Sequence, residues 1–188
     1  MKNTDSYVLG LDISTSCTGI AAIDFTGSVV AFSYCRPTGE TLVEKADMLG
    51  DFVKRWCFDH VGRHPDKVYI EQNLQRFRRG FSSAQVINTL ARFNGMISYI
   101  VYRDLEVQPV YVNVNEGRKS LGIKIARGKN TKEEILKWCS NQYPDIAWPE
   151  KTLKSGPRKG LVILDDCCYD IADAVVTAKA GLTIYDNI

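Results

Sequence analysis

The sequence lacks an apolar run long enough to span a membrane, and it has no recognisable signal peptide. It also lacks a CxxC pair, and with two histidines among its 188 residues no Cys/His set has the spacing of a zinc site. The six cysteines include the adjacent Cys167 and Cys168, a poor pair for a structural disulfide. We therefore expect a cytosolic protein without a membrane partner, with reduced and mostly buried thiols and no catalytic Cys/His arrangement.

The length and composition fit one globular domain that spans residues 1–188, with 45% hydrophobic and 24% charged residues. The net charge of +2 is small, but the charges are segregated along the chain. Basic residues gather at 118–137 and at Arg76, Arg78 and Arg79, whereas the last 24 residues hold five aspartates and one lysine. Each basic run is compatible with a solvated face as well as with a polyanion-binding surface.

Hydrophobic periodicity predicts an α/β fold. Alternating or continuous apolar runs predict strands, and helical spacing of apolar residues predicts helices. The expected strands are 7–13, 18–24, 28–35, 67–71 and 107–112. The expected helices are 41–60, 82–103, 115–121, 131–142 and 169–181, with an extended loop or insertion over 143–160. This order predicts a mixed central sheet, with three antiparallel strands and then parallel strands, flanked by helices.

Single residues refine this prediction. Pro109 either argues against the last strand or places it at an edge of the sheet, because proline cannot donate to a neighbouring strand. Ser82 or Ser83 is the expected cap of the long helix, and Gly95 within that helix is expected to mark a close packing contact.

Four acidic residues occupy positions where an acid is costly. Asp12 and Glu71 each end an apolar strand, and Asp170 and Asp173 share one face of the last helix. A buried carboxylate must be paired, hydrogen-bonded or metal-bound. Taken singly, each has a structural alternative: a turn for Asp12, an arginine partner for Glu71, and a helix cap for Asp170 with a solvated Asp173.

Taken together, the four carboxylates favour a metal centre. Oxygen ligands without accompanying Cys or His suit Mg²⁺ or Mn²⁺. Converging carboxylates can hold two such ions, which stabilise the attacking and leaving oxygens of a phosphoryl displacement. The nearby basic segments would hold a phosphate backbone.

These motifs resemble those of the RuvC-type Holliday junction resolvases, which belong to the RNase H-like superfamily. Residues 9–19 (LGLDISTSCTG) resemble the first-strand motif and 69–72 (YIEQ) the second. Residues 82–101 resemble the long helix that follows, and 112–122 (VNVNEGRKSLG) the segment in which a basic residue precedes a helix. Residues 170–174 (DIADA) resemble the last motif, so the likeness spans 7 to 181.

The resemblance implies an RNase H-like nuclease, a homodimer that makes paired nicks in four-way DNA junctions and leaves 5′-phosphate ends. It implies that two Mg²⁺ ions per active site, replaceable by Mn²⁺, bind Asp12, Glu71, Asp170 and Asp173. It assigns phosphate contacts to Lys119 and Arg118, with Lys129 or Lys132 as a second such group. The residues after Glu71 would contact the junction, and they are Leu74, Arg76, Phe77, Arg78 and Arg79.

The chain also departs from the cellular bacterial pattern. Residues 143–168 are longer than that pattern requires, and the last motif is closer to compact viral or organellar relatives, including those of phages. We expect a bacterial cell, a virus-infected host cell or another DNA-containing compartment as its location. Asp166 lies four residues before Asp170, and of its two expected roles, helix cap and extra metal ligand, we favour the cap.

Three other functions compete with this interpretation. The stretch LDISTSCTG also suits the phosphate loop of a sugar-kinase/actin-like ATPase domain, but such enzymes use two domains. A broader RNase H-like nuclease would act on branched DNA or an RNA–DNA hybrid with the same carboxylates. A non-catalytic nucleic-acid-binding module would gain nothing from negative charge beside phosphate.

Overall fold

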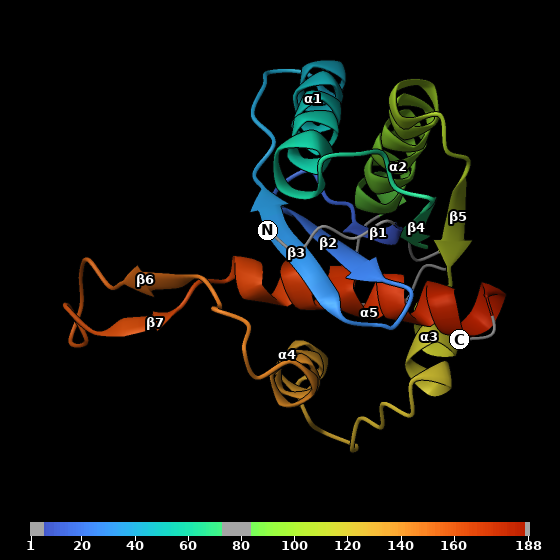
Figure 1. The fold of residues 1–188 in the computed structure, drawn as a ribbon. Helices are drawn as coiled ribbons and strands as arrows, with labels where there is room; N and C mark the ends of the chain where they lie inside the picture. Colours follow the sequence, from blue (N-terminus) through green and yellow to red (C-terminus); the bar gives the residue numbers. More distant parts are fainter. Residues whose placement is uncertain (1–5, 73–83, 187–188) are drawn as a thin grey trace.

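The computed structural model describes residues 6–72 and 84–186, and a five-stranded mixed sheet lies at its centre (Figure 1). The strands stand in the order β3-β2-β1-β4-β5. The first three pair antiparallel, and β4 and β5 extend the sheet in parallel with β1. Their bounds are β1 Tyr7–Asp12, β2 Thr18–Asp24, β3 Val29–Cys35, β4 Lys67–Glu71 and β5 Pro109–Val112.

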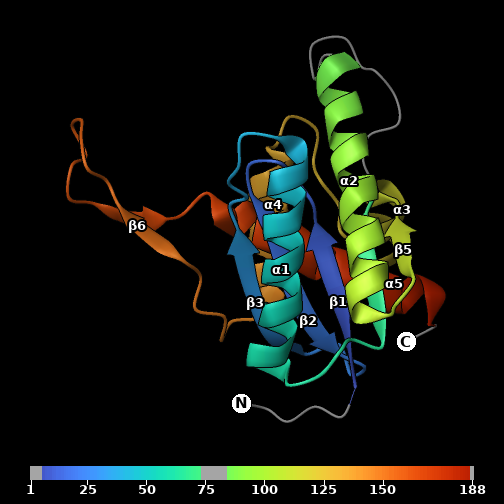
Figure 2. The ribbon, with the colours of Figure 1, turned by 90° about the horizontal axis from the view of Figure 1, so that it is seen from above.

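Helices cover both faces of this sheet (Figures 1 and 2). One apolar cluster joins the sheet to α1 and α2, and a second joins it to α4 and α5. The helix bounds are α1 Leu42–Val61, α2 Ala84–Leu105, α3 Val114–Ser120, α4 Thr131–Gln142 and α5 Cys167–Tyr185. The predicted α/β class, mixed sheet and flanking helices are therefore confirmed, as is Pro109 at the start of the edge strand β5.

The central strands are apolar on both sides because both sides are covered. Every residue from Tyr7 to Leu11 in β1 is buried, and so is every residue from Thr18 to Ile23 in β2. Such strands read as continuous apolar runs rather than as alternating ones. The first polar positions beyond these runs are therefore at the sheet's ends, where Asp12 lies.

Three sequence predictions about the fold differ from the structure. Residues 143–160, expected to be an extended loop or an insertion, contain the first strand of a two-stranded hairpin, β6 Glu150–Thr152 paired with β7 Val162–Leu164. The last helix starts at Cys167 and ends at Tyr185, and so extends beyond 169–181 at both ends. Gly95 marks no close contact, because a Cβ at this position would meet no atom within 4 Å.

The predicted thiol state is confirmed where the structure describes it. All six cysteines are free, five are buried, and Cys17 is half-buried. No helix in the described ranges combines the length and apolar character that crossing a membrane requires. The proposed caps Ser82 and Ser83 lie outside the described residues.

Candidate active site

The sheet's topology brings the two strand-end carboxylates together. β1 and β4 are parallel neighbours, and Leu11 is in register with Ile70. Asp12 and Glu71 follow these two residues and therefore end adjacent strands at the same edge of the sheet. The Asn94 side chain of α2 holds the end of β4, because its amide nitrogen donates to the Glu71 carbonyl at 3.4 Å.

Two glycines allow α5 to lie directly on the strands that carry these ends. A Cβ at Gly19 of β2 would lie 1.9 Å from the carbonyl oxygen of Asp170. A Cβ at Gly10 of β1 would lie 2.2 Å from the carbonyl oxygen of Ala174. Only glycine permits this approach, which places the first turns of α5, with Asp170 and Asp173, beside the end of β1.

The four predicted carboxylates line one cavity of about 300 Å³. Ile13, Ser14 and Ser16 from the turn after β1 form part of its wall. Ile87 and Leu90 of α2 and Lys132 of α4 complete it. The structure thus joins residues 12, 71, 170 and 173, which are far apart in the sequence, at one site.

Burial and mutual repulsion shape the electrostatics of this cavity. Burial raises the pKa of Asp12 well above its ordinary value, and the charges of Glu71, Asp173 and Asp170 raise it further. Burial likewise raises the pKa of Glu71, with a further contribution from Asp173. Burial also raises the pKa of Asp173, although two cations act against it. The site is therefore short of positive charge.

The two cations are Arg118 and Lys132. Arg118 Nη2 lies 3.8 Å from Asp173 Oδ1, and Lys132 Nζ lies 3.4 Å from Asp170 Oδ1. Burial lowers the pKa of Lys132, but the charges of Asp170 and Asp173 outweigh burial and raise it overall. Arg118 Nε is buried without a hydrogen-bond partner among the described atoms, so this guanidinium retains unused donor capacity.

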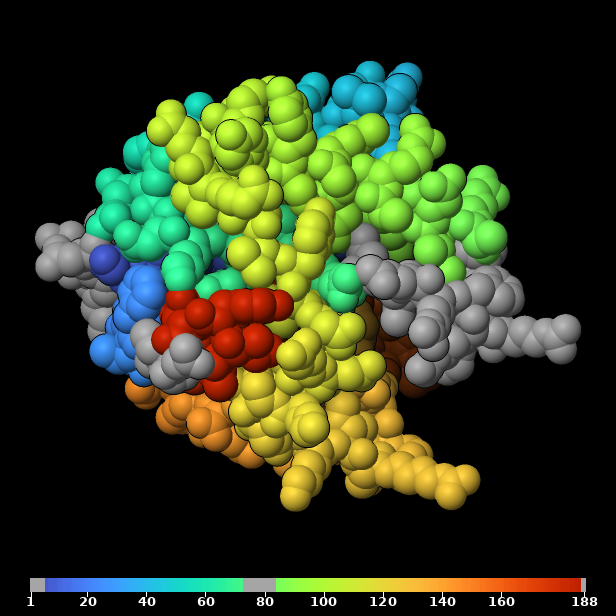
Figure 3. Space-filling view, turned by 90° about the vertical axis from the view of Figure 1, so that its right-hand side faces the viewer, coloured from blue at the N-terminus to red at the C-terminus, as the bar shows by residue number. Residues whose placement is uncertain are grey.

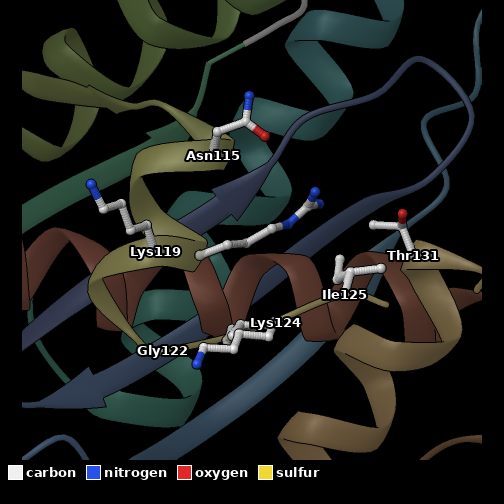
Figure 4. Close-up of a pocket in the computed structure, with 8 residues that line it drawn as sticks. Asn115, Lys119, Gly122, Lys124, Ile125 and Thr131 are labelled. Carbon is white, nitrogen blue, oxygen red and sulfur yellow. The ribbon is translucent and has the colours of Figure 1, made fainter. Parts of the chain in front are cut away.

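A second, basic cavity of about 490 Å³ adjoins the first (Figure 4). α3 and the start of α4 bound it, and its basic side chains are Arg118, Lys119 and Lys124. Arg118 connects the two cavities, because it lines this one and contacts Asp173 in the other. Seen from the side, the surface of α3 lies next to the C-terminal end of α5 (Figure 3).

The predicted phosphate contacts are thus distributed unequally. Lys132 and Arg118 contact the carboxylates directly, whereas Lys119 is exposed and lines only the basic cavity. Lys129 is exposed and lines neither cavity. The predicted junction contacts lie outside the described residues, and they are Leu74, Arg76, Phe77, Arg78 and Arg79.

The favoured role of Asp166 was wrong. It occupies the N-cap position of α5, but its side chain makes no capping hydrogen bond and pairs with Lys151 at 2.5 Å. The cap is Asp165, whose Oδ1 accepts from the backbone N–H of Cys167 at 3.0 Å. Asp165 can do so because Asp166 already has helical φ and ψ, and the Cys167 N–H therefore lies two residues beyond Asp165, the spacing over which a capping side chain accepts.

Sequence reasoning did not identify Ser14, Ser16 and Ile87 as site residues. The two serines follow Asp12 within the first motif, and this proximity was the available signal for them. Ile87 was placed only among the apolar positions of a helix, because periodicity does not distinguish a side chain facing the core from one facing a cavity.

The donor set fits a divalent cation. Four carboxylates from three elements converge on a partly buried cavity that two cations only half neutralise, and hard oxygen ligands suit Mg²⁺ or Mn²⁺. Among the described side chains, no group of three or more His, Cys, Asp or Glu is already arranged to hold a metal ion. Lys132 and Arg118 instead contact Asp170 and Asp173.

Comparison with known proteins shows the fold class that this sheet and cavity belong to. No protein-family model and no curated protein matches the sequence. The chain resembles Thermus thermophilus RuvC in complex with Holliday junction substrate, with 15% identity, 93% of this chain and 91% of that chain covered, and a TM-score of 0.61. It resembles Thermus thermophilus RuvC alone with 17% identity, 93% and 92% coverage, and a TM-score of 0.56.

A eukaryotic structure shares the same architecture. The chain resembles the yeast mitochondrial Holliday junction resolvase Ydc2 with 15% identity, 98% of this chain and 83% of that chain covered, and a TM-score of 0.53. The fold is therefore the RNase H-like fold of the RuvC-type resolvases. The resemblance that the sequence motifs suggested is confirmed in the fold.

Proposed function

We propose that the chain is a metal-dependent endonuclease that cuts four-way DNA junctions. The observation that carries this proposal is the convergence of Asp12, Glu71, Asp170 and Asp173 on one cavity of a RuvC-type fold. A cluster of like charges is costly to fold, because each buried carboxylate repels the others. Such a cost is typical of a functional site rather than of a structural one.

In this proposal the four carboxylates hold Mg²⁺, or Mn²⁺ in its place, with two ions per active site. When bound, the ions supply an activated water for attack on phosphorus and neutralise the leaving 3′ oxygen, which gives 5′-phosphate ends. Asp12 ends the strand beside Glu71, and the charges of Glu71, Asp173 and Asp170 all act on it, so it would be the central ligand of such a metal site.

The cations of the site then act on the nucleic acid. Arg118 and Lys132 contact Asp173 and Asp170 and can turn to phosphate oxygens once the carboxylates are neutralised. Lys119 lines the neighbouring basic cavity, where it would hold the same strand and offset charge in the transition state.

We further propose a homodimer, because paired nicks in a four-way junction need two active sites. α2 exposes Tyr99 and Tyr102, with 63% and 53% of their surfaces accessible. Large exposed aromatic side chains on one helix are typical of a contact surface. The residues that follow Glu71 would face the junction, as the resemblance implies.

The test is cleavage of a labelled synthetic four-way junction in Mg²⁺, beside duplex, fork, single-stranded and RNA–DNA hybrid substrates. Symmetric paired nicks on the junction, lost in Asp12→Asn, support the proposal. Faster cutting of hybrids or forks would support the proposed metal site, but it would show that the enzyme acts on a broader class of nucleic acids than four-way junctions. Cutting of no nucleic acid by the wild-type protein would refute the nuclease function.

A further inference from the structure

The β6–β7 hairpin contributes no residue to the proposed active site. It projects away from the sheet and helices, and its far end contacts no other element in either ribbon view (Figures 1 and 2). It joins the body directly before α5, and its second strand, β7, ends six residues before Asp170. The chain thus places an arm beside the carboxylate cavity.

The base of this arm is fixed to the body by several contacts. Arg36 pairs with Asp165 at 2.5 Å, and Lys151 pairs with Asp166 at 2.5 Å. The Pro149 carbonyl accepts from the Asp165 N–H at 2.9 Å and from the Cys168 thiol at 3.2 Å. These bonds fix the direction in which the hairpin leaves α5.

The tip of the arm is closed by backbone hydrogen bonds. The Leu153 N–H donates to the Leu161 carbonyl at 3.0 Å, and the Gly160 N–H donates to the Leu153 carbonyl at 2.8 Å. The Lys159 N–H donates to the Gly156 carbonyl at 3.1 Å. Because these hydrogen bonds join backbone atoms only, the tip keeps its shape when its polar side chains are replaced.

The charge on the tip has one sign. Residues 153–161 (LKSGPRKGL) include Lys154, Arg158 and Lys159 and no acidic residue, and all three cations are exposed. None of the three forms an ion pair with a described residue. A preorganised, unpaired cationic tip is suited to a polyanion, since its positive charges are not neutralised internally.

We propose that the β6–β7 hairpin is a clamp that binds the phosphate backbone of a DNA duplex arm away from the cleavage site. This inference rests on the proposed nuclease function and adds to it a second contact region. From Pro149 to Pro157 the arm spans eight residues, which would reach about 26 Å at most if every residue rose by roughly 3.3 Å. Because the last of these residues form the turn, the tip reaches phosphates within about 8 base pairs of the base of the arm.

A second copy of this chain fits the hairpin less well. Leu161, Val162 and Leu164 are about half exposed on the hairpin, at 50%, 52% and 43%. Three side chains fall far short of the roughly 800 Å² per partner that a stable interface buries. Two tips with three cations each would also repel one another, whereas phosphate attracts both.

The experiment compares two variants with the same charge change. Arg158→Ser/Lys159→Ser removes two cations from the tip, and Lys54→Ser/Arg55→Ser removes two exposed cations from α1, outside both cavities. For the tip variant we expect about tenfold weaker junction binding at 0.1 M salt and a salt-dependence slope smaller by about 2. The α1 variant should bind as the wild type does.

Two further measurements locate the contact. Hydroxyl-radical footprinting should show that the tip variant loses protection on one duplex arm, within about 8 base pairs of the crossover, and keeps protection at the crossover itself. Its cleavage rate at saturating protein should stay within about twofold of wild type. The charge-conserving Arg158→Lys/Lys159→Arg should bind normally, which separates charge from any effect on folding.

The outcomes distinguish this inference from the proposed function. Junction cleavage by the wild type with equal affinity in the tip and α1 variants would overturn the clamp and leave the nuclease intact. A tip variant that changes the oligomeric state, with an unchanged salt slope, would make the hairpin a contact between copies and also overturn it. A wild-type protein that binds no DNA would refute both.

Discussion

Asp12 lies where the strands, α5 and the cluster of negative charge meet. It ends β1, and the charges of Glu71, Asp173 and Asp170 all raise its pKa in addition to burial. Asparagine keeps the shape of this side chain and removes its charge. We therefore predict that Asp12→Asn abolishes junction cleavage in Mg²⁺ while DNA binding persists, measured by single-turnover cleavage and by fluorescence anisotropy.

The matched control is Asp51→Asn, an exposed aspartate on α1 that lines neither cavity, which should cleave normally. Full cleavage by Asp12→Asn would show that neither Asp12 nor the proposed metal site takes part in the reaction. Loss of both cleavage and binding would indicate a folding defect, which thermal unfolding distinguishes.

The same cluster predicts how the metal-free protein responds to pH. Burial, then Asp173, raises the pKa of Glu71 from 4.5 to about 8, so the folded state holds a proton that the unfolded state has released. A carboxyl with a raised pKa stabilises the fold below its unfolded pKa, and this stabilisation is lost as the pH rises through the folded pKa. Thermal unfolding in EDTA should therefore show a falling Tm between about pH 4.5 and 8.

Mg²⁺ should reverse this loss at pH 8, because it compensates the same charges. Glu71→Gln should reduce the pH dependence in EDTA, since a neutral amide has no proton to release, and Asp12 and Asp173, whose pKa values are also raised, account for what remains. A Tm that is constant or rises over this window in EDTA would show that burial and mutual repulsion do not raise the pKa values of these carboxyls.

Lys119 tests the role of the basic cavity at the residue scale. It is exposed and lines the cavity that Arg118 connects to Asp173. We predict that Lys119→Ala lowers the cleavage rate at saturating protein more than it lowers junction affinity, because its charge acts on the transition state. The reverse pattern, weaker binding with an unchanged rate, would make Lys119 a positioning contact. Lys129→Ala, outside both cavities, is the comparison.

At the scale of elements, the packing of α5 on β2 determines where two of the four carboxylates lie. A Cβ at Gly19 would stand 1.9 Å from the Asp170 carbonyl oxygen, which is backbone and has little freedom to move. We predict that Gly19→Ala displaces α5, destabilises the fold by about 3 kcal/mol and reduces cleavage strongly. Urea unfolding and junction cleavage measure the two effects.

Gly95→Ala is the matched control for this substitution. A Cβ at Gly95 would meet no atom within 4 Å, and alanine is the better helix former by roughly 0.5–1 kcal/mol. This variant should be slightly more stable than wild type and fully active. Equal behaviour of the two alanine variants would show that α5 does not depend on contact with β2 at Gly19.

The elements differ in how far the sequence predicted them. α4 was predicted at 131–142, its observed bounds, and the structure shows why the bounds are sharp: Asn130 caps the helix, and Ile135, Leu136 and Cys139 are buried at helical spacing. The hairpin was missed because β6 and β7 have three residues each and are mostly exposed. Their exposure leaves no buried face to impose alternation, so the Gly and Pro residues of the tip dominated the interpretation.

The candidate site was predictable where burial makes an acid costly. Asp12, Glu71 and Asp173 stood out because apolar residues precede or follow them along the chain. Lys132 did not stand out over Lys129, since both belong to one basic run and only the start of α4 places the first against Asp170. Asp165 and Asp166 are adjacent in the sequence. Which of them caps α5 depends on the path of the chain from β7 into the helix, and the order of residues does not give that path.

For the whole molecule, the open question with the largest consequence is how many chains act together. α2 exposes Tyr99 and Tyr102 beside Pro109 and Tyr111 of the edge strand β5, and symmetric cutting of a four-way junction requires two active sites. We predict a dimer at micromolar concentration by analytical ultracentrifugation. Tyr99→Glu should dissociate it, because a two-fold interface would then bury two charges, one from each copy.

Dissociation should change the pattern of cleavage more than its chemistry. Each Tyr99→Glu monomer keeps Asp12, Glu71, Asp170 and Asp173, so nicks should persist, but the two strands should be cut independently rather than within one bound complex. A supercoiled plasmid with an extruded cruciform distinguishes these cases, since coupled cuts give linear product and independent cuts give nicked circles. Val43→Glu on α1, at a side chain 56% exposed, should stay dimeric and coupled. A wild-type monomer that still makes coupled cuts would refute the dimer, because one cavity cannot reach both strands at once.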